Sequence, residues 1–181
     1  MTLLEEIEKI VGDNGIIFGE DVFNRKAGIW IDDGIRADAI VRPKNTEELS
    51  KVLSICNQLN QEVIPHGGLT GLAEGAISKK GQIAISSERM KDIEEIDEIG
   101  RTITVQAGVP LERVQEEAEK YNLMLAVDLG ARGSCTIGGN ISTNAGGNMV
   151  IKYGMMRDSV LGLEAVLADG KVVTSMNQML K

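Results

Sequence analysis

The chain has 181 residues, of which 43% are hydrophobic, so it is long enough for one globular domain or two small lobes. Its formal net charge is −8 and it has no basic run, which excludes nucleic acid as the main partner, because phosphate backbones require clustered cations. It shows no basic, apolar leader and no apolar run of membrane-spanning length, and its two cysteines lack metal-ligand spacing. We therefore expect a cytoplasmic protein without a metal site.

The first part of the chain predicts a small parallel β unit with helices. Apolar residues recur with helical spacing over 3–11, which predicts a short amphipathic helix. A strand over 37–41 precedes a helix that Asn45 caps, with Glu48 reaching back to the capping residue. A further strand over 62–65 follows. Because this strand, helix, strand order occupies only about 25 residues, we expect the two strands to be parallel.

The remaining elements are mainly antiparallel. Residues 82–86 predict a strand, and 93–106 predict a hairpin. Pro110 opens a helix whose apolar residues again recur at helical spacing. A second hairpin is expected around Asp169-Gly170, since Asp-Gly is a strong turn signal.

These elements predict an α+β fold with two lobes. We expect an N-terminal helical extension over 1–35 and a first lobe over 36–90 that holds the parallel strands. A second lobe over 91–181 should hold a larger, mainly antiparallel sheet with helices, and we place the joint between the lobes near 88–95.

The first of two glycine-rich stretches runs from Pro65 to Gly75, directly after a predicted strand. Four glycines within nine residues allow the backbone to approach a ligand closely, and successive N–H groups can form an anion site that suits a pyrophosphate. The Gly-Lys-Ser/Thr ending of a P-loop is absent, and the glycine spacing of a dinucleotide-binding βα unit is absent too. A simple surface turn remains an alternative at this point.

The second stretch runs from Asp128 to Gly147 and is rich in Gly, Ser, Thr and Asn. It has neither helical nor strand periodicity throughout, and irregular segments of this length in a compact domain are usually functional or disordered. Ile137, Ile141 and Ala145 recur every four residues, which indicates about one buried helical turn. Small residues with hydroxyl and amide groups suit a flat, polar ring system.

Several motifs together carry a resemblance to a known family. They are Gly67-Gly68-x-Thr70-Gly71-Leu72, Gly133-Ser134-Cys135-x-Ile137-Gly138-Gly139, Thr143-Asn144-Ala145-Gly146-Gly147 and Leu161-Gly162-Leu163-Glu164. From about Arg36 to the C-terminus, the sequence resembles the FAD-binding domain of vanillyl-alcohol oxidase and p-cresol methylhydroxylase-type flavoproteins. Within that family it is most similar to glycolate oxidase, D-lactate dehydrogenase and D-2-hydroxyglutarate dehydrogenase.

The resemblance implies non-covalent binding of FAD by residues of both stretches. The pyrophosphate would be bound by Pro65, His66, Gly67, Gly68, Leu69, Thr70, Gly71 and Leu72. The flavin and ribityl side would be bound by Asp128, Leu129, Gly133, Ser134, Cys135, Thr136, Gly138 and Gly139. Further contacts would come from Ser142, Thr143, Asn144 and Ala145. The sequence departs from the family pattern at His66, where Arg or Gln is frequent, at Leu69, where Gly or Asn is common, and at Glu74, where a small residue is usual.

Neither His66 nor Cys135 is identified as a catalytic residue. Some relatives attach the flavin through a histidine that follows the glycine pair, whereas His66 precedes it. We therefore expect a structural or phosphate-neighbouring role for His66, ahead of catalysis or covalent attachment. Cys135 is expected to be a small packed residue, because no activating histidine lies near it in the sequence.

The resemblance implies that the intact protein continues with more of the FAD-binding domain and a substrate domain that supplies the catalytic base. We interpret the chain as the FAD-binding part of an oxidoreductase that oxidises a 2-hydroxy acid, such as D-lactate or glycolate, by hydride transfer to FAD. Two alternatives stay open. The chain is either an FAD-carrying subunit that a partner chain completes, or a non-catalytic fragment. Alone, it is expected to be inactive.

Overall fold

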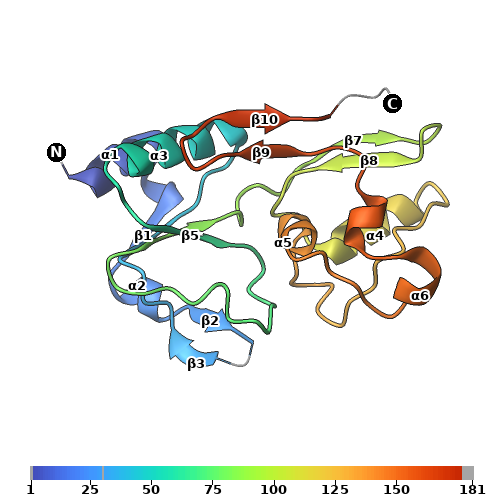
Figure 1. Ribbon diagram of the computed structural model, residues 1–181, viewed down its shortest axis with the longest axis horizontal. Coiled ribbons are helices and arrows are strands. Elements are labelled where there is room, and N and C mark those ends of the chain that lie inside the picture. The colour runs from blue at the N-terminus through green and yellow to red at the C-terminus, as the bar shows by residue number, and fades with distance from the viewer. Residues whose placement is uncertain (1, 30, 177–181) are drawn as a thin grey trace. The chain divides into compact units, whose positions relative to one another are not determined.

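The computed structural model describes residues 2–29 and 31–176 (Figure 1). A few residues lie outside the described part: Met1 and Trp30 of the predicted extension, and 177–181 of the predicted second lobe. The chain forms two compact units. Unit 1 comprises Met1–His66, Gly71–Arg89 and Leu161–Lys181, and unit 2 comprises Gly67–Thr70 and Met90–Val160. The chain passes from unit 1 to unit 2 after Arg89. No helix of the described part is long and apolar enough to cross a membrane.

Unit 1 contains a four-stranded sheet in the order β1-β4-β6-β5. The strands are β1 (Ile16–Phe18), β4 (Ala39–Val41), β6 (Ile83–Ser86) and β5 (Val63–His66). β4 and β5 both pair in parallel with β6, and β1 pairs antiparallel with β4. The predicted parallel unit is confirmed, with β6 inserted between the two strands. Because β4 and β6 are buried throughout, β4 and the first three residues of β6 are continuous apolar runs rather than alternating ones.

Two helices form the core of unit 1 with this sheet. α1 (Leu3–Val11) and α3 (Thr46–Gln58) lie side by side, and both were predicted (Figure 1). Ile7 of α1 and Val52 of α3 are fully buried in one cluster with the sheet. The Asn45 side chain caps α3 by accepting from the Glu48 N–H at 2.8 Å, as expected. The Glu48 side chain was expected to reach back to the capping residue, Asn45. Its carboxylate instead accepts from the N–H of the preceding residue, Lys44, at 2.9 Å.

Residues before 36 are an integral part of unit 1 and not an extension of it. Besides α1 and β1, they form η1 (Asp13–Gly15), α2 (Glu20–Phe23), β2 (Lys26–Gly28) and β3 (Ile31–Gly34). The side chains of α1 and β1 belong to the buried cluster of the sheet.

An ion-pair network further ties this segment to the sheet. The Glu88 carboxylate bridges Arg25 at 2.6 Å and Arg42 at 2.9 Å. Burial acts to raise the pKa of Glu88, but hydrogen bonds and charge from the two arginines outweigh it and lower the pKa.

Unit 2 is built from a hairpin, short helices and long irregular segments. β7 (Ile93–Asp97) and β8 (Thr102–Val105) form the predicted antiparallel hairpin. α4 (Leu111–Glu119) begins after Pro110 as predicted and buries Leu111, Val114 and Ala118. Three shorter helices follow: α5 (Ile137–Ser142), α6 (Val150–Tyr153) and η2 (Met156–Ser159). A second apolar cluster, which includes Val109, Val127 and Met156, forms the core of this unit.

The last hairpin, β9 (Glu164–Val166) with β10 (Val172–Thr174), belongs to unit 1 and not to the second part of the chain. It contacts α3, where the Thr46 hydroxyl donates to Glu164 at 2.6 Å and the Ser50 hydroxyl donates to the Gly170 carbonyl at 2.6 Å. The mixed α+β class is confirmed. The described antiparallel strands outside the main sheet form separate two-stranded hairpins, including β2–β3.

Gly170 offers a test of how this hairpin is held. It has a φ of +86°, and a Cβ there would lie 2.6 Å from the Ser50 carbonyl oxygen. Gly81 has a nearly identical φ of +89° with nothing within 4 Å. Gly81→Ala should therefore lose only about 1 kcal/mol from the positive φ. Gly170→Ala should lose about 1–3 kcal/mol more, because its neighbours must move.

The measurement is the free energy of unfolding of each variant in urea. Equal losses for the two variants would show that the hairpin does not pack against α3 as described.

Candidate functional site

The first glycine-rich stretch leaves the sheet at the carboxyl end of β5. Pro65 and His66 are the last residues of that strand. The next four residues, Gly67–Thr70, belong to unit 2, and Gly71 and Leu72 return to unit 1. Ligands of open sheets with parallel strands bind beyond the carboxyl ends of the strands, so the position of this loop suits a binding role.

The two predicted stretches come together within unit 2. A Cβ on Gly67 would lie 2.7 Å from the Thr136 hydroxyl oxygen, and a Cβ on Gly68 would collide with the Ser134 carbonyl oxygen. A Cβ on Gly139 would also lie 3.3 Å from the Thr136 hydroxyl. Backbone of the first stretch therefore contacts the second directly. We call the residues Gly67–Thr70 and Gly133–Gly139 the glycine site.

Unused hydrogen-bond donors collect at the glycine site. Within residues 2–29 and 31–176, no hydrogen bond to another atom of the chain is donated by the backbone N–H groups from 67 to 72. Thr136 is only 8% exposed, and its hydroxyl has no hydrogen-bond partner among the described residues. Buried polar groups are normally paired, so the Thr136 hydroxyl points to a partner that the chain itself does not provide. The N–H groups from 67 to 72 belong to half-buried and exposed residues and are therefore accessible to an acceptor from outside the chain.

Two of the three departures from the family pattern, Leu69 and Glu74, lie at positive φ angles. Leu69 has a φ of +54° and Glu74 a φ of +58°. This region favours Gly and, among residues with a Cβ, Asn. Sequences with Gly or Asn at the position of Leu69 would therefore adopt the same loop conformation with less strain.

The second stretch is more ordered than a loop. The predicted helical turn is present as α5, in which Ile137 and Asn140 are buried, whereas Ala145 lies beyond its end. Gly138 is required for packing, because a Cβ there would lie 2.7 Å from the Cβ of Ala107. The Gly138 N–H donates to the Ala107 carbonyl at 2.8 Å.

The start of this stretch carries charged side chains that pair with one another. Asp128 lies 3.1 Å from Arg132, and Arg132 lies 3.5 Å from Glu112. Leu129 is half-buried beside them, and Gly133 and Ser134 are exposed in the turn that follows. Both carboxylates adjoining the glycine site are thus engaged with a guanidinium.

Residues from Ser142, the last of α5, to Ala145 satisfy polar groups within unit 2. The hydroxyls of Ser142 and Thr143 donate to the Gly138 and Gly139 carbonyls at 2.7 and 2.9 Å. Asn144, at a φ of +49°, accepts from the Arg157 N–H at 3.0 Å. The Ala145 carbonyl accepts from the Met156 N–H. Their side chains therefore stabilise the fold, which leaves their role toward a cofactor a prediction.

The histidine and the cysteine of the site are both buried. His66 is 3% exposed, and its Nε2 lies 2.9 Å from the Ala76 carbonyl oxygen. Burial lowers the pKa of His66, against opposing effects of that carbonyl and of the Glu88 carboxylate. Cys135 is 2% exposed, and its sulfur accepts a hydrogen bond from the buried Asn140 at 3.4 Å. Neither Ala76 nor Ala107 was singled out from the sequence, since an isolated alanine carries no pattern.

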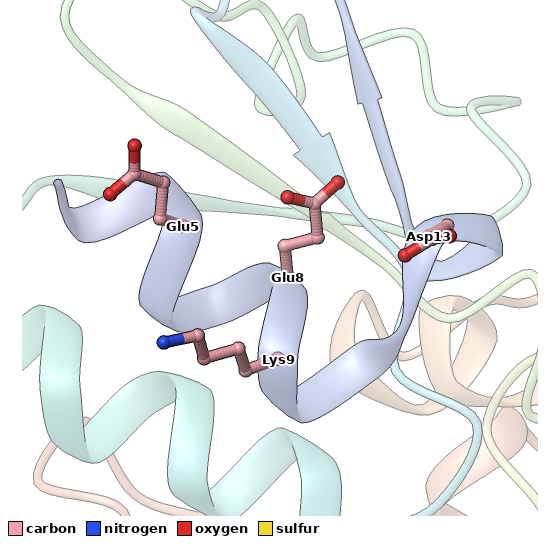
Figure 2. A pocket seen from close by; sticks show the side chains of 4 residues that line it. All are labelled: Glu5, Glu8, Lys9 and Asp13. Carbon is pink, nitrogen blue, oxygen red and sulfur yellow. The ribbon is translucent and has the colours of Figure 1, made fainter. Parts of the chain in front are cut away.

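A surface hollow of the described chain lies away from the glycine site. It lies on unit 1 beside α1 and is lined by Glu5, Glu8, Lys9 and Asp13, none of them a predicted site residue (Figure 2). No group of three or more His, Cys, Asp or Glu among the residues that the structure describes is placed to hold a metal ion.

Comparisons with curated proteins identify relatives with this sequence. D-2-hydroxyglutarate dehydrogenase, mitochondrial, from Danio rerio is 43% identical over 145 residues, which are 80% of this chain and 27% of the relative. A probable D-2-hydroxyglutarate dehydrogenase, mitochondrial, from Oryza sativa subsp. indica is 40% identical over 175 residues, which are 96% of this chain and 31% of the relative. The chain thus spans less than a third of the length of these two proteins.

Solved structures and a family match agree on the fold. Alkyldihydroxyacetonephosphate synthase is similar with a TM-score of 0.81 and 20% identity, over 96% of this chain and 34% of that one. p-Cresol methylhydroxylase is similar with a TM-score of 0.77 and 20% identity, over 95% and 34%. Residues 37–175 match the FAD binding domain family, close to the extent expected from the sequence motifs. The chain therefore belongs to the family of FAD binding domains.

Proposed function

We propose that the glycine site binds FAD, with the backbone N–H groups of 67–72 directed to the pyrophosphate. The observation that carries the proposal is this run of unused donors beside the unpaired Thr136 hydroxyl. An array of backbone N–H groups can bind a doubly charged anion without side-chain cations. Such recognition also explains how a chain of net charge −8 can bind an anionic cofactor.

The remaining predicted contacts complete the proposed site. The segment from Asp128 to Gly139 is assigned to the flavin and ribityl side, and 142–145 to further backbone contacts. Bound in this way, FAD would supply the electron-accepting group of an oxidoreductase. The chain would supply binding and orientation.

We further propose that the FAD is held non-covalently. The two candidate attachment residues within the predicted site, His66 and Cys135, are 3% and 2% exposed, and both are engaged in hydrogen bonds inside the chain. Neither side chain is thus available to form a bond to the isoalloxazine ring.

Oxidation of a 2-hydroxy acid is the proposed activity of the whole protein. The names of the two curated relatives support D-2-hydroxyglutarate as the substrate, with D-lactate and glycolate as related candidates. About 70% of the length of those relatives lies outside the match, since the chain covers 27% and 31% of them. We propose that the substrate-binding and catalytic residues belong to that remainder, or to a partner chain. The cytoplasmic location stays a prediction, since both relatives are named mitochondrial.

Gly71 provides the sharpest test of the pyrophosphate assignment. A Cβ at Gly71 or at Gly75 meets nothing within 4 Å, and neither residue has a positive φ. Gly71→Val should therefore fold normally but weaken FAD binding by about tenfold or more, because the side chain holds the phosphates away from the backbone. Gly75→Val, outside the predicted site, should keep wild-type affinity. Gly68 is unsuitable for this test because its Cβ would collide with Ser134.

The measurement is the dissociation constant from quenching of flavin fluorescence, with the free energy of unfolding as a control. Wild-type affinity in Gly71→Val would show that the loop does not contact the pyrophosphate.

Non-covalent binding is tested by acid precipitation of the FAD-loaded protein. All yellow colour should remain in the supernatant and none in the washed pellet. The acid unfolds the protein, and a flavin without a covalent bond to it is then released. A yellow pellet would identify covalent attachment.

The isolated chain should bind FAD without reducing it. Both carboxylates beside the glycine site are paired with Arg132, so neither is free to act as a general base. The FAD-loaded chain should keep its flavin absorbance with D-2-hydroxyglutarate, D-lactate or glycolate in the absence of oxygen. Dithionite, as the control, should bleach it. Bleaching at an enzymatic rate by any hydroxy acid would place a complete active site within these 181 residues.

A further inference from the structure

One side-chain hydrogen bond joins the two ends of the glycine-rich loop. His66 precedes the loop over 67–75 and Ala76 follows it, and the His66 Nε2 lies 2.9 Å from the Ala76 carbonyl oxygen. A carbonyl oxygen can only accept, so Nε2 carries the proton and donates. The ring is 3% exposed, and water therefore does not compete for this bond.

The loop between these ends has few other constraints of its own. The N–H groups from 67 to 72 make no hydrogen bond within the described part of the chain. Leu69 and Glu74 have positive φ angles, which residues with a Cβ adopt at a cost in free energy. Among the loop glycines, Gly67 and Gly68 lie so close to residues 134–136 that a Cβ on either would collide with them, whereas a Cβ on Gly71 or Gly75 would meet nothing within 4 Å. At the far end of the loop, the Glu74 carbonyl accepts a hydrogen bond from the Ile77 N–H at 3.1 Å. The conformation of residues 69–73 between these points therefore depends on how the loop is closed.

We propose that His66 is a positioning residue of the FAD site, which closes the loop so that its N–H groups converge before the cofactor arrives. The proposal rests on the proposed function of this loop. A flexible loop must lose conformational freedom on binding, and fixing its ends in advance reduces that loss. His66 thus acts on FAD through the backbone of the loop and not by contact with the cofactor.

Two substitutions that differ by one methylene group test the idea. In His66→Gln, the side-chain amide nitrogen can occupy the place of Nε2 and donate to Ala76. In His66→Asn, the amide is one methylene too short to reach it. FAD affinity should remain within about threefold of wild type in His66→Gln and fall by about tenfold or more in His66→Asn.

A second measurement follows the loop without FAD. Amide hydrogen exchange of the peptide covering 67–76 should be faster in His66→Asn than in wild type or His66→Gln, because a loop without its closing bond opens more often. Val52→Ala, which shortens a fully buried side chain of α3, controls for lost stability and should keep both the exchange of this peptide and the FAD affinity.

The outcomes separate this inference from the proposed function. Wild-type FAD affinity in His66→Asn, or equal weakening in His66→Gln and His66→Asn, would overturn the positioning role while leaving FAD binding intact. Failure of the wild-type chain to bind FAD would overturn the proposed function, and the positioning role with it.

Discussion

The close approach of two backbone segments is the constraint on which the candidate site depends. Gly67 and Gly68 pack directly against Ser134 and Thr136, at distances that leave no room for a Cβ. Gly68 packs against the Ser134 backbone and Gly67 against the short Thr136 side chain, so the start of the loop is fixed to the second stretch without any long side chain. The N–H groups from 67 to 72 donate no hydrogen bond within the described part of the chain. The glycine contacts thus fix the start of a loop whose donors are left unpaired.

The recognition that results is independent of side-chain charge. Cations near the site are already engaged, as Arg132 is with Asp128 and Glu112. Backbone donors do not titrate and have no rotamers, so their attraction for a phosphate does not vary with pH as that of a histidine would. The remaining polar side chains, such as Ser142 and Thr143, hold the fold together. In the proposed site, the backbone N–H groups therefore bind the phosphates, and the polar side chains stabilise the fold.

Local signals in the sequence predicted the regular elements well. The Asn45 cap, the helix after Pro110 and the turn at Asp169-Gly170 all depend on a few neighbouring residues, and all are present. Features that depend on distant contacts could not be predicted. The requirement for Gly138 arises from Ala107, and the integration of residues before 36 arises from packing against the sheet. The site motifs could be recognised in the sequence, but the packing contact that requires glycine at each position could not.

The return of the last hairpin to α3 has a consequence for how the chain folds during synthesis. Thr46 and Glu164 are bonded across 118 positions of sequence. A ribosome that adds about 5–20 residues per second needs roughly 6–24 s to synthesise that interval. Until then the hydroxyl-bearing face of α3 lacks its partner, so unit 1 is completed only after all of unit 2 has emerged. Such long-range closure slows folding, because the cost of closing a long stretch of chain comes before the contact that rewards it.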